Sequence, residues 1–403
     1  MKTEHEQGRS PAWHTRKRFL KNRLAVVGLS YILLLTLIAI PGYLILPDPS
    51  PDANAQIIEL KTQPPGTQAL ILKKRKNLQL PETSFLSAML EGRESPYNFI
   101  PVAEYEFVKD SLRITRVTGW EGEKGPTEHY LLADIHFALD LESVRSEDNT
   151  VYFEDAVGGQ QQIELQELAN LVEENNLEKR HFLLGTDSFG RDLFSRLLLG
   201  IRVSLSVGFI AVLISLVIGI TLGTIGGYFR GFADDVVMWF INVWWSLPTL
   251  LLVIAFSLAL GKGFWQVFVA VGVSMWVEVA RIVRGQIMST REKEFVEAAR
   301  ALGYGSFRTI TRHLLPNITG PLIVVCAANF AAAILLEAGL SFLGIGVQPP
   351  VPSWGYMIKE NYMMIVFGNA YLAVLPGIFI CLTVLAFYLV GNGLQDALDV
   401  RGK

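Results

Sequence analysis

Residues 203–225 read VSLSVGFIAVLISLVIGITLGTI, a run of 23 positions without a single Asp, Glu, Lys or Arg. A helix that crosses a bilayer needs roughly 20 apolar residues, because the hydrocarbon core is about 30 Å thick and each residue rises about 1.5 Å. The whole chain of 403 residues is 51% hydrophobic, which is too apolar for a soluble protein of that length. The sequence therefore predicts an all-α polytopic membrane protein.

Five further segments are long and apolar enough to cross a bilayer: residues 24–46, 236–260, 264–283, 318–340 and 371–394. The first of them follows a basic leader, residues 1–23, and could be taken for a signal peptide. It is longer than the roughly 7–15 apolar residues of a signal peptide and lacks a small-residue cleavage site, so we expect a retained anchor. Six spans would place both termini on one side of the membrane.

The Lys and Arg residues of the short loops indicate the orientation, because positive residues near membrane ends are retained in the cytoplasm. The leader and the loop 281–313 are basic, whereas the loop 341–370 carries only Lys359. We therefore expect a multi-pass protein of the cytoplasmic (inner) membrane with both termini in the cytoplasm. The formal net charge of −3 gives no electrostatic footprint for nucleic acid.

The segment 47–185 has the composition of a soluble domain, with 24 Asp and Glu against 13 Lys and Arg. Polar and apolar residues alternate over 104–108 and 111–117, which is the period of a half-buried strand. Residues 130–139 form another strand candidate, and 151–154 and 163–165 flank a Gly-Gly turn. Residues 164–179 repeat apolar side chains at helical spacing. We expect a small extracytoplasmic α+β insertion between the first two spans.

The cytoplasmic stretch 294–316 predicts two short helices. The first ends at Gly303, which can adopt the left-handed conformation that ends a helix, and the second runs from Ser306 until Pro316 stops it. Ala298 and Ala299 are expected on one face, so the hairpin could lie in a groove of a partner protein. The alternative is an ordinary connecting loop.

Charged residues in or near spans are costly to bury and invite a functional interpretation. Glu278 precedes Arg281 by one turn, and a structural ion pair is expected. Glu337 lies deeper and is either a hydrogen-bonded structural carboxylate or part of a transport pathway. Pro248 should kink the third span.

The polar stretch before the second span is a further candidate. Thr186 and Asp187 are expected to cap an interfacial helix. Arg191 and Asp192 are candidates for pairing with other extracytoplasmic groups of an assembled channel. Gly190 lies between these two pairs in the same polar stretch.

We expect no catalytic residue, metal site or cofactor in this chain. It contains no Walker pattern G-x-x-x-x-G-K-[ST], so it lacks an ATPase site of its own. Cys326 and Cys381 fall inside predicted spans and are interpreted as packing residues. A secondary transporter remains a remote alternative, although no pseudo-repeated halves are visible.

Several motifs together resemble one family. Glu297-Ala298-Ala299, Gly303 and His313-Leu314-Leu315-Pro316 resemble the EAA loop of bacterial ABC importer permeases. Residues 184–196, LGTDSFGRDLFSR, are similar to a signature of the dipeptide/oligopeptide/nickel branch, as are 339–346, GLSFLGIG, and 391–399, GNGLQDALD. The resemblance covers residues 15–46 and 181–400 and is strongest to the C-type permease subunit. Trp239 and Asn242 depart from the family's usual Arg and Asp, and the insertion is longer than usual.

The resemblance implies a type I ABC importer permease fold and a channel-forming subunit that translocates short peptides, with nickel or another small ligand as the alternative. The implied partners are a second homologous permease, two cytoplasmic ATPases that bind ATP and Mg, and an extracytoplasmic substrate-binding protein. In this interpretation Glu297 makes polar docking contacts, Ala298 and Ala299 allow close approach, and Gly303 forms the turn. Leu315 and Pro316 complete the motif.

Overall fold

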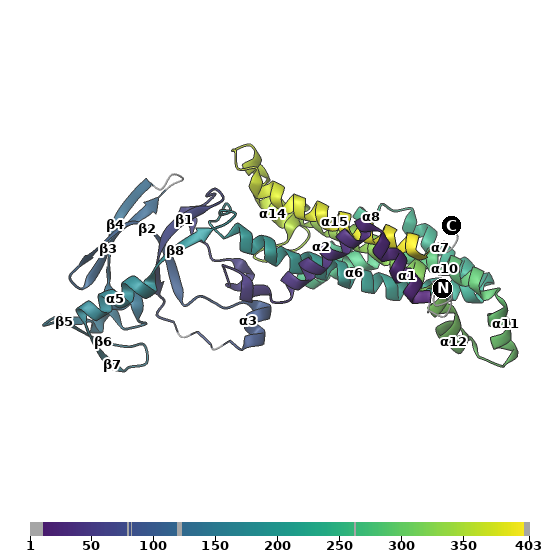
Figure 1. Ribbon diagram of the computed structural model, residues 1–403, viewed down its shortest axis with the longest axis horizontal. Helices are drawn as coiled ribbons and strands as arrows, with labels where there is room; N and C mark the ends of the chain where they lie inside the picture. The colour runs from purple at the N-terminus through teal and green to yellow at the C-terminus, as the bar shows by residue number, and fades with distance from the viewer. Residues whose placement is uncertain (1–10, 79, 82, 119–122, 262, 399–403) are drawn as a thin grey trace, which may run out of the picture. The chain divides into compact units, whose positions relative to one another are not determined.

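A computed structural model describes residues 11–398 except 79, 82, 119–122 and 262 (Figure 1). The first ten residues of the predicted leader, and Asp399 of the C-terminal motif, lie outside the described residues. The chain divides into two compact units, and each is described by itself. The first comprises Met1–Ile40, Gly200–Lys359 and Ala373–Lys403, and the second comprises Pro41–Leu199 and Glu360–Leu372.

Four helical stretches are each long and apolar enough to cross a membrane. They are Leu193–Phe229 (α6), Phe264–Arg291 (α9, Phe264–Ser274, and α10, Trp276–Arg291), Ser306–Leu343 (ending in α13, Thr319–Leu343) and Tyr371–Leu398 (α15). Two bent helix pairs also pass this test. They are α1 (Pro11–Lys21) with α2 (Arg23–Ala39), and α7 (Gly231–Trp245) with α8 (Thr249–Leu260). If each pair is one span, the described residues contain six spans, as predicted.

Two spans differ from the prediction in shape. The first ends as an α-helix at Ala39, before Pro41 and a 3₁₀ turn at Gly42–Ile45, and not at residue 46. The third is broken and not merely kinked, since α7 and α8 meet at 91° around Ser246–Pro248. Proline lacks the N–H that would continue the helical hydrogen bonds, and here the chain turns sharply instead of bending.

Helices of the first unit pack closely where small residues face one another. Gly219, Gly223 and Gly227 recur every four residues along α6, and a Cβ atom on Gly223 would lie 2.4 Å from the carbonyl oxygen of Ala280 on α10. Small residues let membrane helices approach backbone to backbone. α1 and α2 pack on α15 through Phe19, Ala25 and Val390, so the first and last helices of the described chain lie together in this unit.

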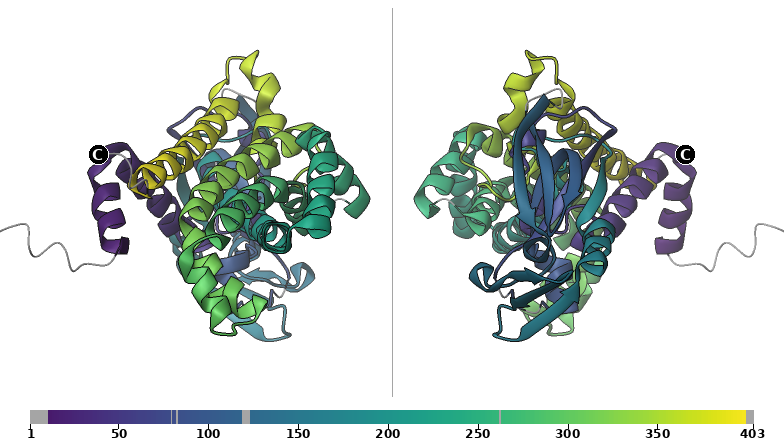
Figure 2. Two further views of the ribbon diagram at one scale, coloured as in Figure 1. Left: turned by 90° about the vertical axis from the view of Figure 1, so that its right-hand side faces the viewer. Right: turned by 90° about the vertical axis from the view of Figure 1, so that its left-hand side faces the viewer.

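The second unit is built on a five-stranded antiparallel sheet in the order β4-β3-β2-β1-β8, which Figure 2 shows face on at the right. The strands are β1 (Thr67–Arg75), β2 (Tyr97–Val108), β3 (Ser111–Thr118), β4 (Glu123–Leu131) and β8 (Leu177–Phe182). A second sheet contains β5 (Arg145–Glu147), β6 (Thr150–Glu154) and β7 (Gln160–Glu164). The helices are α3 (Phe85–Glu91), α4 (Leu132–His136) and α5 (Leu165–Asn176).

One hydrophobic core joins both sheets to α4 and α5, through Leu112 and Ile114 of β3, Val151 of β6 and Leu168 of α5. The α+β class, the 104–108 and 111–117 strands, the hairpin and the helix that follows it are confirmed. The strand predicted at 130–139 is wrong beyond Leu131, where β4 ends, because residues 132–136 form α4. A short apolar run cannot by itself distinguish a buried strand from a buried helix.

The compact unit is also larger than the predicted insertion at 47–185. It begins at Pro41, includes the turn before α6, and gains Glu360–Leu372 from far along the chain. α14 (Trp354–Asn361) leads into this returning segment. Tyr371 at its end donates a hydrogen bond of 2.8 Å to the carbonyl oxygen of Gln63.

Candidate functional sites

The predicted cytoplasmic hairpin consists of α11 (Glu294–Ala301) and α12 (Ser306–Thr309). Gly303 has φ of +81°, as predicted for a helix-ending glycine. Its N–H donates to the carbonyl oxygen of Arg300 at 2.9 Å, and the N–H of Tyr304 donates to that of Ala299 at 3.1 Å. This pair of bonds is a Schellman motif, which ends α11 and fixes the direction in which the chain leaves.

The second arm of the hairpin is braced and runs on into the next span. The ring of Tyr304 stacks on that of His313 with centroids 5.8 Å apart, and the guanidinium of Arg308 lies 4.3 Å from the Tyr304 ring centroid. The prediction that Pro316 stops the helix is wrong. The chain passes through a π-turn at Ile310–Leu314 and a 3₁₀ turn at Leu315–Ile318 into α13.

Side-chain hydrogen bonding and helix geometry explain this continuity. Proline removes one helical hydrogen bond and crowds the preceding turn, and the wider π-turn relieves that crowding. The Asn317 side chain donates to the carbonyl oxygen of His313 at 2.6 Å. Leu315 is half-buried and Pro316 is exposed.

The two alanines of the EAA motif do not share a face. Glu297 and Ala298 are exposed, whereas Ala299 is only 3% exposed and turns toward the chain's own helices. Adjacent residues on a helix point about 100° apart, so the prediction of a common face for both alanines is wrong. Glu297 and Ala298 remain the motif residues available to a partner.

Sequence reasoning missed two exposed apolar side chains at the tip of the hairpin. Leu302 is 73% exposed and Phe307 is 81% exposed. Their exposure depends on the turn between α11 and α12, which periodicity does not determine. Large exposed aromatic side chains are frequent anchors of protein interfaces.

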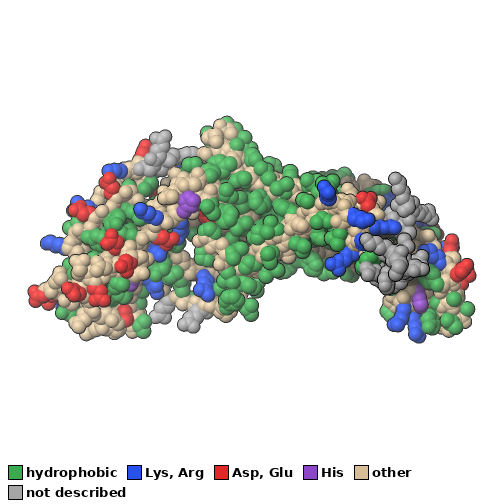
Figure 3. All heavy atoms as spheres, in the orientation of Figure 1, with side chains coloured by type: hydrophobic (Ala, Val, Ile, Leu, Met, Phe, Trp, Pro, Cys, Tyr) green, Lys and Arg blue, Asp and Glu red, His purple; other side chains and the backbone are tan. Residues whose placement is uncertain are grey.

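Lys and Arg side chains gather at the end of the first unit that carries α1, α11 and α12 (Figures 1 and 3). The middle of this unit presents a broad hydrophobic surface in the same view. Among the residues at this end, Arg230 pairs with Glu292 at 2.6 Å, and Arg284 pairs with Asp234 through two bonds of 2.5 and 2.6 Å.

The polar stretch before α6 forms a tight turn around Asp187. This carboxylate accepts the N–H of Phe189 at 2.9 Å and that of Arg191 at 3.0 Å. Gly190 has φ of +72°, and a Cβ atom there would lie 1.8 Å from the carbonyl oxygen of Ile57. Only glycine fits this position, for both reasons.

The helix cap is a different residue from the one predicted. Asp192 caps α6 by accepting the N–H of Ser195 at 2.8 Å, and its position next to the helix N-terminus suits a carboxylate. Burial raises the pKa of Asp192, and its hydrogen bonds from Ser195 oppose that shift. Thr186 instead accepts the N–H of Gln63 at 2.9 Å and donates to the carbonyl oxygen of Leu60. These two bonds attach the turn to the segment that precedes β1.

Arg191 forms ion pairs within its own chain. Its Nε donates to Asp187 at 2.7 Å, and its Nη2 donates to Glu360 of the returning segment. Arg196 lies 3.5 Å from Asp187 and 3.7 Å from Glu360. Burial raises the pKa of Glu360, while the two arginines lower it. The four side chains form a buried network, and sequence reasoning missed Arg196 and Glu360.

Glu337 on α13 is fully buried, with 0% exposure. It accepts a hydrogen bond of 2.6 Å from the hydroxyl of Ser341, which in turn accepts the N–H of Val347 at 3.0 Å. These bonds connect the end of α13 to the loop that follows. The arrangement is that of a hydrogen-bonded structural carboxylate, and a role in the pathway stays a prediction.

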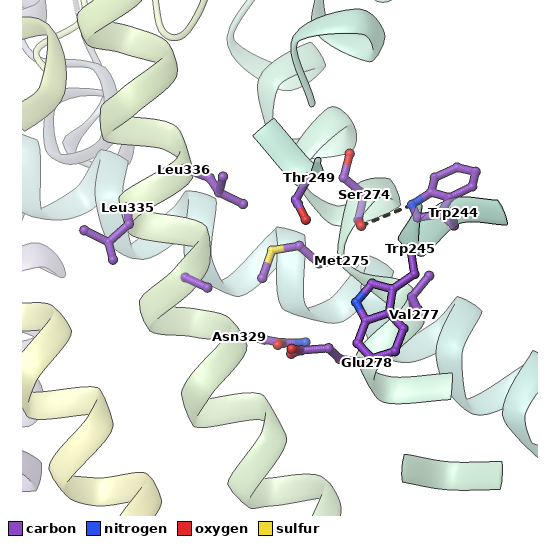
Figure 4. Close-up of a pocket in the computed structure, with 11 residues that line it drawn as sticks. Trp244, Trp245, Thr249, Ser274, Met275, Val277, Glu278, Asn329, Leu335 and Leu336 are labelled. Carbon is purple, nitrogen blue, oxygen red and sulfur yellow. Dashed lines mark hydrogen bonds between the residues drawn. The ribbon is translucent and has the colours of Figure 1, made fainter. Parts of the chain in front are cut away.

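The predicted ion pair between Glu278 and Arg281 is absent from the described part of the chain. Arg281 lies over the ring of Trp245, 3.8 Å from its centroid. Glu278 lines a pocket of about 350 Å³ in the first unit (Figure 4). The other lining residues are Trp244, Trp245, Thr249, Ser274, Met275, Val277, Asn329, Ala332, Leu335 and Leu336.

Comparison with known proteins identifies the family. Residues 203–402 match the family described as binding-protein-dependent transport system inner membrane component, and residues 10–65 match the N-terminal transmembrane domain of oligopeptide transport permease C. The dipeptide transport system permease protein DppC of Bacillus subtilis is 42% identical over 58% of this chain and 72% of its own length. The chain belongs to the family of binding-protein-dependent transport system inner membrane components. It is thus a multi-pass inner-membrane permease of the ABC importer class.

This permease is also similar to a second transport permease and to a chain of known structure. The glutathione transport system permease protein GsiD of Pectobacterium atrosepticum is 41% identical over 55% of this chain and 73% of its own. Among solved structures, an inward-facing MetNI methionine ABC transporter chain matches 51% of this permease and 97% of its own length, at 19% identity and a TM-score of 0.43. Residues 66–202, which contain the eight strands found in the described part of the chain, fall outside both family matches.

Proposed function

We propose that this permease is one of two channel-forming subunits of an importer for short peptides. Relatives at 36–42% identity are named as dipeptide, glutathione and oligopeptide transport permeases. ATP and Mg would bind to two separate ATPase subunits, and an extracytoplasmic protein would deliver the peptide. The exposed hairpin α11–α12 is the observation that supports an ATPase-coupled mechanism best.

The hairpin has the properties that a coupling element requires. Glu297, Ala298, Leu302 and Phe307 present both polar and apolar groups to a partner. The Schellman motif and the Tyr304–His313 stack hold the two arms in one geometry. Because the second arm continues into α13, a displacement of the hairpin moves a membrane span as a rigid body.

The same arrangement supports the orientation inferred from charge. Lys and Arg gather near the hairpin, which supports a cytoplasmic location for this end of the first unit and for both termini. The part of the second unit that contains the two sheets, residues 64–184 (the sheet domain), would then be extracytoplasmic. In a variant without Cys326 and Cys381, single cysteines at Ser146 and Ser306 report the two sides, since both serines are exposed. An impermeant reagent should label only position 146 in spheroplasts, and labelling of only position 306 would reverse the topology.

Uptake by the copurified complex in proteoliposomes tests the proposed function. Labelled dialanine should enter only when the binding protein is present on the substrate side and ATP on the ATPase side. Nickel uptake without peptide uptake would replace the peptide with the metal as substrate. Uptake driven by an ion gradient without ATP would indicate a secondary transporter instead.

A further inference from the structure

The pocket of about 350 Å³ lies where two helix pairs of the first unit are interrupted. Trp244 and Trp245 end α7 just before the 91° bend, and Met275 separates α9 from α10. Helix α13 forms the opposite wall with Asn329 and Leu336. The volume is within the range of about 300–1,000 Å³ that is usual for small-molecule sites.

Two polar side chains meet in this otherwise largely apolar pocket. Asn329 on α13 and Glu278 on α10 point toward one another in Figure 4. Asn329 is only 1% exposed, and its amide Nδ2 has no hydrogen-bond partner. Leaving a buried donor without a partner is energetically unfavourable, so this amide is available to a ligand acceptor.

Glu278 also lacks a counter-ion. Within the part of the chain that the structure describes, no Lys, Arg or His lies within salt-bridge distance of its carboxylate. Arg281, three residues away, is held over the ring of Trp245 instead. The pocket therefore presents one carboxylate acceptor beside one amide donor.

The aromatic walls are fixed in place. The indole N–H of Trp244 donates to the carbonyl oxygen of Ser274 at 3.3 Å, and its ring stacks on Phe256 with centroids 5.6 Å apart. Aromatic rings attract cations and contact apolar side chains equally well. The pocket matches a ligand that carries a cationic group, a carbonyl oxygen and a small apolar side chain close together.

We propose that this pocket binds the amino-terminal residue of a short peptide on its way through the permease, an inference that rests on the proposed function. Glu278 accepts hydrogen bonds from the peptide ammonium, and Asn329 Nδ2 donates to the first peptide carbonyl. Trp244 and Leu336 contact the first side chain. An anionic ligand without an amine does not suit the pocket, because the carboxylate would repel it.

Equilibrium binding to the purified complex in nanodiscs, without ATP or binding protein, tests this site. Labelled dialanine and N-acetyl-dialanine differ only at the amino terminus, where acetylation replaces the ammonium with a neutral amide and adds a small acyl group. The wild type should bind dialanine about tenfold or more tightly than the acetylated peptide, because a hydrogen bond to a charged group is worth roughly that factor. Glu278→Gln should remove this difference, and Asn329→Leu should weaken binding of both peptides.

Control variants make the outcome decisive. Glu106→Gln removes an exposed carboxylate from β2 of the other unit and should bind both peptides like the wild type. Glu278→Asp retains the charge and should keep the preference for the free amine. Equal binding of both peptides by the wild type, or an undiminished preference in Glu278→Gln, would refute the site.

The same preparations separate this proposal from the proposed function. The wild type could bind dialanine with the expected preference and yet not accumulate it in proteoliposomes with ATP and the binding protein. That result would refute the peptide-import function and support the pocket. If uptake is normal and Glu278→Gln still distinguishes the two peptides, the import function stands and the pocket assignment fails.

Discussion

Gly303 shows how one backbone conformation can affect transport. Its φ of +81° disfavours a β-branched residue by roughly 1–3 kcal/mol, although a Cβ atom there meets nothing within 4 Å. We expect Gly303→Val to reach the membrane at normal abundance and to lose ATP-driven uptake, because α11 and α12 are misaligned. Glu297→Lys should lose uptake as well, by removing a polar docking contact.

Gly305 provides a matched control for this prediction. It lies two residues away, faces equally open space and has φ of −67°, which any residue adopts. Gly305→Val should therefore transport normally at matched protein levels. Equal uptake by both valine variants would show that the geometry of this turn does not matter for coupling.

Tyr130 of β4 is a titratable residue whose pKa the fold changes. Its burial and its 2.5 Å hydrogen bond to Glu128 raise the pKa of Tyr130 to about 12, from the ordinary 10.0. Since the folded value is the higher one, the stabilising contribution is complete below pH 10 and is lost as the pH rises from 10 through about 12. Ultraviolet titration of the isolated sheet domain should show one late tyrosine, and Tyr130→Phe should remove it. A titration curve unchanged by that variant would contradict the assignment.

Among the elements, the hairpin tip should carry much of the ATPase contact. Phe307 is 81% exposed, and an aromatic anchor at an interface is worth about 2 kcal/mol or more. Phe307→Asp should weaken ATPase binding by about tenfold or more in a pull-down with purified subunits. Phe85→Asp, at a phenylalanine with 65% exposure on α3, serves as the matched control and should bind normally. Normal binding by Phe307→Asp would place the contact elsewhere on the hairpin.

The sequence predicted elements well where the signal is local. The apolar spans, the alternating β2 and β3 strands and the left-handed Gly303 all follow from rules that act over a few residues. The errors at Pro316 and 130–139, and the underestimated bend at Pro248, share another cause. Proline and short apolar runs allow more than one backbone path, and tertiary packing selects among them.

The candidate sites also divide into those that depend on neighbouring residues and those that depend on tertiary packing. The hairpin motif is continuous in the sequence and could be found there. The network of Arg191 and Glu360 joins residues 169 positions apart, and no periodicity predicts such a pairing. The exposure of Phe307 and the meeting of Asn329 with Glu278 likewise depend on how helices are placed in space.

For the molecule as a whole, the sheet domain should fold without the membrane spans. Its core is formed within the strands and helices between β1 and β8, and β8 closes the sheet beside β1. Residues 64–184 expressed alone should therefore give a cooperative thermal transition with a mixed α/β circular dichroism spectrum. A disordered spectrum would mean that the returning segment 360–372 is required for folding.

The buried arginine network also sets an order of events during synthesis. Arg191 leaves the ribosome 169 residues before Glu360, an interval of roughly ten to thirty seconds at about 5–20 residues per second. Until then, Arg191 and Arg196 have only one of the two carboxylates that surround them in the finished protein. The turn that carries these arginines therefore stays incomplete until Glu360 is synthesised, and any translational pause within that interval prolongs its exposure to proteases.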